Sequence, residues 1–355
     1  MKLTPTGLLL TSLLAISLSG IAQAKLEQKI VYKIQLISKF TFPGLTIKLP
    51  GEQTKFQPAL GDDFTVSAET GLYGVALGSE YEQVEARFGS PNFVFTPSED
   101  TTVLAYGRTH WLTFTNNKLT KVEYGTGLFN NTLVNYLEFD DRFDIRQWQV
   151  SGGLTAGSKV EREGNEQPTL TRHGSSILEL HTDTLFKNNQ KYKVEELSGF
   201  TLYAVNQSER PTYDFSQLNN QVLTRLNEQL EQKESVGLID VRKLEYQPLA
   251  YSLKTGGKHY QLYDEHTLVE VVGNAVNRII ISPDFLEQDL VTGQPWQYGS
   301  FFYGMSKDAV LELAGDSAFT MSDYVAFERD GYDARVYFDE QNNKTIAHSM
   351  EVVLY

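Results

Sequence analysis

Two pairs of glycines, each eleven residues apart, constrain the fold of this chain more than any other feature. The first pair lies in "YGVALGSEYEQVEARFGSP" (residues 73–91) and the second in "YGSFFYGMSKDAVLELAG" (residues 298–315). Each pair encloses a run with a polar start and apolar residues at helical spacing, which predicts a short helix between glycines. The residues that mark the two stretches are Gly78, Ser79, Val84 and Gly89, and Gly304, Ser306, Val310 and Gly315.

The ends of the first helix can be predicted from its flanking residues. Ser79 suits the N-cap position, and Glu82 lies three residues later, as in a capping box. Gly89 suits the left-handed position that follows a helix. Ser306 is the predicted cap of the second helix, so aligning the closing glycines places Ser306 opposite Glu80 and offsets the two caps by one residue.

Strand-like segments follow both helices in the same order. After the first come "TVLAYGRTHWLTFT", an "NNK" turn and "LTKVEYG", and after the second come "DYVAFERDG", "YDARVYFDE", "QNNK" and "HSMEVVLY". Their apolar residues alternate, which predicts an antiparallel meander with one buried face. A weaker third copy begins at residues 152–168, with Ser158 and Glu161 as a capping pair, and a diverged fourth is expected around residues 214–281.

These patterns predict an α+β fold of tandem modules, each with one short helix followed by an antiparallel β-meander. Additional strands are expected in residues 25–70, and one longer helix over residues 214–234. The apolar stripe of that helix is formed by Phe215, Leu218, Val222, Leu226 and Leu230. The expected organisation is a signal peptide in residues 1–24, N-terminal strands in 25–70, a first half in 71–206 and a second half in 207–355.

The first 24 residues predict export. Lys2 precedes an apolar run, and "AQA" at residues 22–24 has the small residues of a cleavage site. We therefore expect a bacterial periplasmic or secreted protein with no transmembrane helix after signal removal. The chain has no cysteine, which excludes disulfides and a lipid anchor on cysteine, and its formal net charge of −14 argues against nucleic acid as a partner.

Motifs for catalysis or cofactor binding are missing from the sequence. "GVALGSE" lacks the lysine of a phosphate-binding loop, and no nucleophile elbow or His-Glu-x-x-His motif occurs. Asp264 and His266 would share a strand face and are weak metal candidates, although a polar turn explains them as well. The acidic pairs Asp62–Asp63, Asp140–Asp141 and Asp264–Glu265 are interpreted as solvated surface. We expect no catalytic residues and no cofactor.

Three side chains are candidates for binding a partner. If His110, Leu112 and Phe114 point into the core, Trp111 points away from it. By the same alternation Arg335 and Tyr337 point away from the core in the C-terminal copy. Tyr, Trp and Arg anchor many protein interfaces, so these residues either form a binding surface or pack under another covering layer.

The motif "YGMSKDAVLELAG" and the aromatic-rich meander after it resemble a module found in two families. One is the β-lactamase inhibitor protein family, which has tandem copies, and the other is the SmpA/OmlA family of outer-membrane assembly lipoproteins. Gly304, Met305, Ser306, Val310 and Gly315 carry the resemblance, and Gly78, Val84 and Gly89 fit it less fully. It implies a non-catalytic fold whose sheet surface contacts another envelope or secreted protein.

The sequence is also compatible with two other functions. One is a periplasmic carbohydrate- or cell-wall-binding protein, or an enzyme, with a groove between units. The other is an outer-membrane β-barrel, which the alternating, Tyr-rich composition and the final "MEVVLY" would suit.

Overall fold

The computed structural model describes residues 40–42, 45–47, 57–125, 127–150, 152–160, 170–187, 192–207, 221–231, 239–252, 258–287 and 295–355. The chain forms two compact units, Met1–Gln53 and Thr54–Tyr355. In the first, strands β1 (Phe40–Phe42) and β2 (Leu45–Ile47) pair antiparallel. The predicted signal peptide lies outside the described residues.

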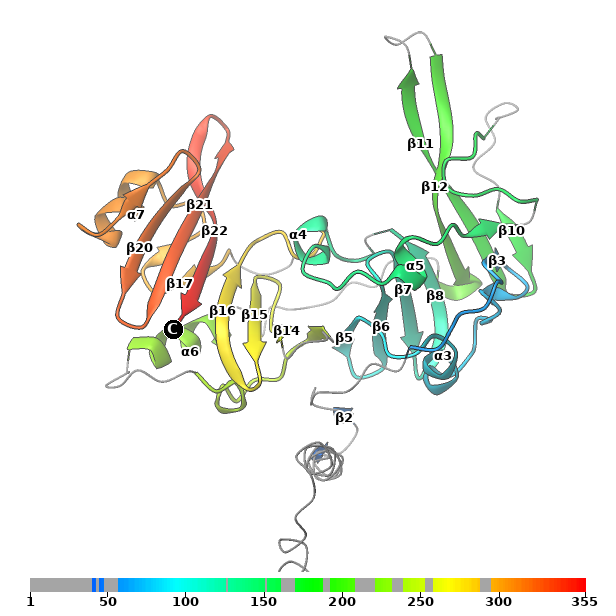
Figure 1. The fold of residues 1–355 in the computed structure, drawn as a ribbon, viewed down its shortest axis with the longest axis horizontal. Coiled ribbons are helices and arrows are strands. Elements are labelled where there is room, and N and C mark those ends of the chain that lie inside the picture. The colour runs from blue at the N-terminus through cyan, green and yellow to red at the C-terminus, as the bar shows by residue number, and fades with distance from the viewer. Residues whose placement is uncertain are drawn as a thin grey trace, which may run out of the picture. The chain divides into compact units, whose positions relative to one another are not determined.

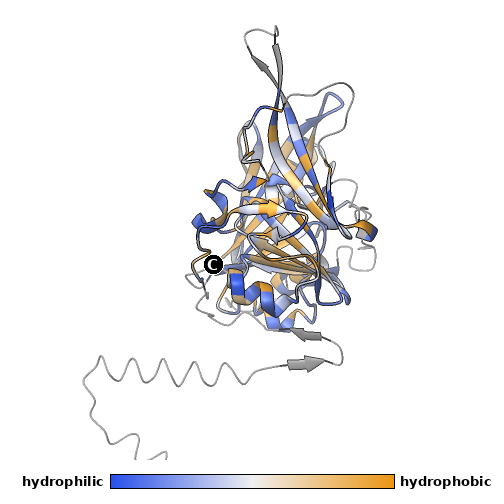
Figure 2. Cartoon of the chain, turned by 90° about the vertical axis from the view of Figure 1, so that its right-hand side faces the viewer, coloured by the Kyte–Doolittle hydropathy of each residue, from blue (hydrophilic) through white to orange (hydrophobic). Residues whose placement is uncertain are grey.

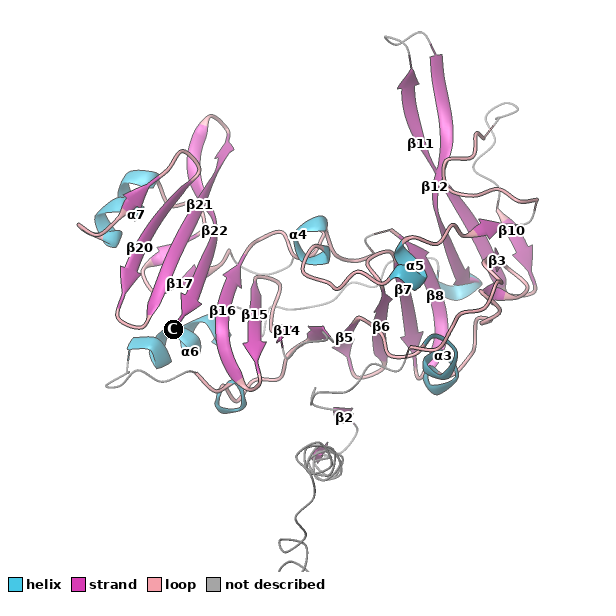
Figure 3. Cartoon of the chain, in the orientation of Figure 1, coloured by secondary structure: helices cyan, strands magenta, loops and turns pink. Residues whose placement is uncertain are grey.

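The fold is α+β, as predicted, and most of its regular structure is antiparallel sheet (Figure 3). The described residues contain five α-helices, most of them short. The helices are α3 (Tyr81–Phe88), α4 (Asn131–Val134), α5 (Asp141–Asp144), α6 (Gln221–Glu231) and α7 (Lys307–Ala314), with 3-10 turns η1 (Val205–Gln207) and η2 (Val241–Lys243).

The second unit contains one sheet of fifteen strands and two small sheets (Figure 1). In spatial order the large sheet has β10 (Thr171–His173), β11 (Ser176–Lys187), β12 (Tyr192–Ala204), β8 (Lys118–Tyr124), β7 (His110–Thr115), β6 (Thr101–Tyr106), β5 (Phe93–Ser98), β13 (Ala250–Ser252), β14 (Lys258–Leu262), β15 (Thr267–Val272), β16 (Ala275–Ile281), β22 (Lys344–Leu354), β21 (Tyr332–Gln341), β20 (Tyr324–Arg329) and β19 (Phe319–Thr320). The small sheets contain β4 (Gly71–Leu72), β3 (Thr65–Ser67) and β9 (Gln149–Val150), and β17 (Gln297–Tyr298) and β18 (Phe301–Phe302).

One backbone arrangement occurs in four segments: A (residues 71–124), B (152–204), C (239–281) and D (297–354). In each, an N–H of the last strand donates to a carbonyl just before the helix or turn of that segment, over 2.8–2.9 Å. In each, the last strand has a bulge of one extra residue directly after that donor. The four donor–acceptor pairs are Leu119–Ser79, Leu197–Ser158, Val276–Ile239 and Ala347–Met305.

The helices of segments A and D, α3 and α7, end alike. Both have eight residues, and both are followed by a glycine at positive φ, 83° at Gly89 and 78° at Gly315. The predicted N-cap of α3 is wrong by one residue: Glu80 is the cap, in a capping box with Gln83. The carbonyl of Ser79 accepts the N–H of Leu119, so Ser79 stays in extended pairing and the helix begins later.

This shift removes the offset expected between the two caps, because Glu80 and Ser306 lie equally far before the closing glycines. In segment C the same place is taken by η2, which Asp240 caps, rather than by a long helix. The predicted helix of the third copy lies outside the described residues. The described part of the predicted longer helix is α6, and its stripe residues Val222, Leu226 and Leu230 are buried as expected. The other two predicted stripe residues, Phe215 and Leu218, lie outside the described residues.

Segments A and B pair through their last strands, and segments C and D pair in the same register. Glu123 of β8 faces Thr201 of β12, and Glu351 of β22 faces Ile280 of β16. All four residues lie four positions after the donors described above. Strands β5 and β13 join the two pairs of segments, with Val94 opposite Tyr251.

The sheet has an inner face, which packs on α3, α6 and α7, and an outer face. The inner face carries two hydrophobic cores, one in segments A and B around Val84 and Phe88, and one in segments C and D around Val310 and Leu226. Hydrophobic and hydrophilic residues are interspersed along the strands (Figure 2). A third core lies on the outer face and covers only its middle.

Candidate functional site

A continuous row of residues crosses the outer face, each one directly opposite the next in the strand ladder. Such directly opposed side chains lie about 5 Å apart and contact each other. The row starts at one edge of the sheet and ends at the other, and its residues are Phe319, Ala326, Arg335, Glu351, Ile280, Leu268, Leu262, Ala250, Phe95, Val103, Thr113, Lys121, Tyr203, Ile177 and Arg172.

The middle of this row is covered by residues 128–137, which follow segment A. Phe129 pairs with Leu286, and the N–H of Asn130 donates to the carbonyl of Phe285, so the chain after segment C completes the cover. The covering residues form the outer-face core with the apolar residues of the row. The middle of the outer face is therefore closed.

Trp111 lies under this cover. Of the two interpretations of this residue, packing under a covering layer is therefore correct and an exposed binding surface is wrong. Its side chain is 1% exposed, and its ring centroid is 5.1 Å from that of Phe129. Its Nε1 donates to the carbonyl of Gly125 over 3.0 Å, which satisfies the indole. Alternation correctly places Trp111 on the face opposite Leu112, but that face is also buried.

Arg335 and Tyr337 lie on the uncovered part of the outer face, in segment D, and the structure brings them together. Arg335 Nη1 is 3.9 Å from Glu351 Oε2, and the Tyr337 hydroxyl donates to the same oxygen over 3.3 Å. The Arg335 side chain remains 55% exposed. The Tyr337 ring centroid is 5.7 Å from that of Tyr324 on the neighbouring strand.

Arg278 of β16 closes this arrangement from the other side. Its Nη1 donates to Glu351 Oε1 over 2.8 Å, so the Glu351 carboxylate lies between two arginines and a tyrosine. Glu351 is largely buried and is thus held in one position, whereas Arg335 keeps donors free to face solvent. No sequence pattern indicates Arg278, because its contact with Glu351 joins residues far apart in the chain.

A second held carboxylate, Glu270, lies beside Arg278 in the ladder. It accepts hydrogen bonds from the Tyr260 hydroxyl over 2.8 Å and from Asn277 Nδ2 over 2.6 Å. Burial by itself would raise the pKa of Glu270, but these hydrogen bonds and the charge of Arg278 lower it below its usual value. The carboxylate therefore stays charged and fixed.

Tyr136, from the covering segment, borders the uncovered region. Its ring centroid is 5.1 Å from that of Tyr260. Burial raises the pKa of its hydroxyl, and the charge of Glu351 raises it further. We define the open patch as Tyr136, Arg278, Phe319, Tyr324, Arg335, Tyr337 and Glu351. It contains four aromatic rings and two arginines around one fixed carboxylate.

The metal candidates Asp264 and His266 lie in the buried turn between β14 and β15. Their shared contact is within the turn, where the His266 backbone N–H donates to Asp264 Oδ1 over 2.9 Å. Burial raises the pKa of the Asp264 carboxyl, mainly by desolvation. Across the part of the chain that the structure describes, no three His, Cys, Asp or Glu side chains are grouped so as to hold a metal ion.

The interpretation of the acidic pairs as solvated surface is wrong for Asp264–Glu265, in which both residues are buried, and for Asp140. Asp141, Asp62 and Asp63 are exposed, as expected.

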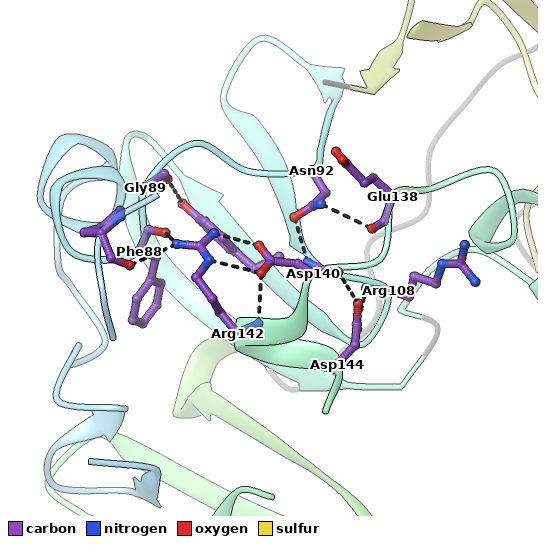
Figure 4. A network of polar contacts seen from close by, with 11 residues as sticks. Phe88, Gly89, Asn92, Arg108, Glu138, Asp140, Arg142 and Asp144 are labelled. Atoms are coloured by element: carbon purple, nitrogen blue, oxygen red, sulfur yellow. Dashed lines mark hydrogen bonds and ion pairs between the residues drawn. The ribbon is translucent and has the colours of Figure 1, made fainter. Parts of the chain in front are cut away.

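Asp140 belongs to a polar network that holds segment A together (Figure 4). The guanidinium of Arg142 forms a two-point ion pair with Asp140, with contacts of 2.6 and 3.0 Å. Its Nη1 also donates to the carbonyl of Phe88 at the end of α3, over 2.9 Å. Asp144 accepts the backbone N–H of Arg108 over 2.7 Å. These groups satisfy one another, which indicates a structural role.

Comparison with known proteins finds no matching family model, no matching curated protein and no matching solved structure. None of the helices in the described residues has the length and apolar character that crossing a membrane requires. The open patch is therefore the site on which a function can be argued, from its own geometry.

Proposed function

We propose that this chain is a non-catalytic protein-binding protein, built from tandem modules that correspond to segments A to D, and that the open patch of segment D is its binding surface. The four recurring hydrogen bonds and bulges support the modular organisation. We expect it to act as an exported protein of the cell envelope, as the N-terminal sequence and the family resemblance imply.

The observation that carries this proposal is the difference between two matching faces. The outer face of segment A is closed by the chain itself, with Phe129 packed on Trp111. The corresponding face of segment D presents aromatic and arginine side chains to solvent. Tyr, Phe and Arg are enriched at the centres of protein interfaces, where they combine apolar area with directed hydrogen bonds.

The rigidity of the patch also favours binding over chemistry. Glu351 is fixed by Arg278 and Tyr337 before any partner arrives, so little side-chain freedom is lost on association. The patch offers no nucleophile next to a base, because its ionisable groups are arginines, tyrosines and one carboxylate that is ion-paired with arginine.

Site-specific photo-cross-linking in the producing bacterium tests the proposal. A photo-reactive residue at Ala326, in the row between Phe319 and Arg335, should form a covalent adduct with one protein. The matched control is the same residue at Glu312, an exposed position of α7 on the inner side of the sheet. The adduct at Ala326 should disappear when Arg335→Ala is added. Equal labelling at both positions, or a glycan ligand with no protein adduct, would refute the proposal.

A further inference from the structure

We infer that the open patch binds an extended protein segment that adds a strand to the free edge of β19 and lays an aromatic side chain, with a carboxylate nearby, over Phe319 and Arg335. This inference rests on the proposed function and specifies its mode of recognition. It is argued from segment A, where the chain supplies its own occupant for the same surface.

The rows of segments A and D correspond residue by residue. In segment A the ladder runs from Phe93 through Ala105 and Trp111 to Glu123. In segment D it runs from Phe319 through Ala326 and Arg335 to Glu351. Both rows thus begin with phenylalanine, continue with alanine and end with glutamate, and they differ in type only where Arg335 replaces Trp111.

Segment A shows what fills such a row. The ring of Phe129 packs against both of its aromatic side chains, with centroid distances of 5.3 Å to Phe93 and 5.1 Å to Trp111. Strand β13 pairs with the outer edge of β5, with Tyr251 opposite Val94. The occupant is therefore an aromatic ring together with an added strand, and Phe93 and Trp111 are almost completely buried.

In segment D both places are open. Among the described residues, β19 pairs with β20 alone. Phe319 is 56% exposed and Met321 45% exposed, although a large apolar side chain on an unpaired edge is normally protected. The Met321 N–H donates to the carbonyl of Tyr324, so by antiparallel alternation the backbone groups of Thr320 point away from β20, toward the free edge.

The change from Trp111 to Arg335 selects the chemistry of the occupant. Glu351 is held by Arg278 at 2.8 Å, whereas Arg335 is 3.9 Å away and mostly exposed, which leaves Arg335 able to pair with a second carboxylate. An aspartate or glutamate next to the inserted aromatic residue would meet this guanidinium. The partner segment is therefore aromatic and acidic, and extended.

A displayed library of random peptides of about twelve residues, long enough for one added strand, is the probe. Selection on the full-length protein should enrich peptides with an aromatic residue and an Asp or Glu within two positions of it. For a selected peptide, Arg335→Ala should weaken binding by at least about tenfold, and Arg335→Lys should weaken it less. Enriched peptides without an acidic residue would overturn the assignment of Arg335.

Thr320→Pro tests the added strand. It removes the N–H that faces the free edge and leaves the bonds between β19 and β20 in place, so the melting temperature should not change. Binding of the peptide should fall by about tenfold or more, as it should for a peptide N-methylated at alternate amides. Unchanged binding in both measurements would refute strand addition.

The outcomes separate this inference from the proposed function. If Arg335→Ala abolishes the protein adduct at Ala326 but Thr320→Pro does not, the patch binds a partner through its face alone and only the strand addition is wrong. If no adduct and no peptide is found, both fail. A homodimer that Thr320→Pro converts to monomer would show that β19 pairs with a second copy and would also refute the inference.

Discussion

Segments A and D place the same kind of row on the same face of one sheet, yet one is core and the other is surface. Phe93 and Phe319 hold corresponding positions, and the first is fully buried whereas the second is 56% exposed. The difference arises from later parts of the chain, since residues 128–137 and β13 cover segment A. Burial of a strand residue is thus decided by remote segments, even where the local geometry is shared.

The largest expected effect is that of Trp111→Ala. Removing this ring leaves a cavity beneath Phe129 and an unpaired carbonyl at Gly125, and should lower the free energy of unfolding by about 3–5 kcal/mol. The matched variant Arg335→Ala should change it by less than about 1 kcal/mol, because the Arg335 side chain is mostly exposed and Glu351 keeps its ion pair with Arg278. Urea unfolding measures both, and similar losses in the two variants would contradict the comparison.

The arginines that hold the ends of α3 and α7 provide the second test. Arg142 donates to the carbonyl of Phe88 from a buried ion pair, and Arg329 donates to that of Ala314 from a more exposed position. Arg142→Gln leaves Asp140 buried without its partner and should lower the free energy of unfolding by about 3 kcal/mol, whereas Arg329→Gln should lower it by about 1 kcal/mol. Equal losses of stability in thermal unfolding would show that the ion pair of Arg142 with Asp140 adds no stability.

The pH dependence of stability should differ between the segments, because segment A buries His110 where segment D has Ala334. Burial lowers the pKa of His110 from 6.5 to about 3, so below pH 6.5 the unfolded state takes up the proton and the folded state does not. Stability should therefore fall as the pH drops, by about 2 kcal/mol between pH 6.5 and about pH 5. His110→Gln should remove this part of the slope, and an unchanged slope would mean that other groups cause it.

The smallest expected effect on stability is that of Phe319→Ser, at most about 0.5 kcal/mol, because its ring is already in water. Phe93→Ser, at the corresponding position, should cost several kcal/mol, about as much as other buried aromatic truncations. Differential scanning calorimetry distinguishes the two. A large loss for Phe319→Ser would show that β19 is protected by contacts of its own.

The features that depend on a few neighbouring residues can be predicted from the sequence. Gly89 adopts the positive φ predicted for it, and Gly315 ends α7 with the same sign of φ. The paired asparagines after β7 and β21 form the turns expected of them, with positive φ at all four. The N-cap at Glu80 was not predicted because it depends on the hydrogen bond that the Leu119 N–H, far along the chain, donates to the Ser79 carbonyl.

For the candidate site, alternation identified the face but not its surroundings. It grouped Arg335 with Tyr337 correctly, since residues two apart in a strand share a face. The same rule put Trp111 on the outer face, where only the position of Phe129 makes it core. Arg278 and Tyr136 join the patch through strand order and through a covering segment, and no periodicity in the sequence indicates either.

The identical register of β8 with β12 and of β16 with β22 has a consequence for folding kinetics. The last strand of each segment can pair, in the same geometry, with the last strand of more than one other segment. Several pairings of similar energy therefore compete while the chain folds. Refolding from denaturant at high protein concentration is therefore expected to produce strand-exchanged oligomers, in which β12 of one molecule pairs with β8 of another. Synthesis from the N-terminus, which completes segments A and B before C and D emerge, would suppress these products.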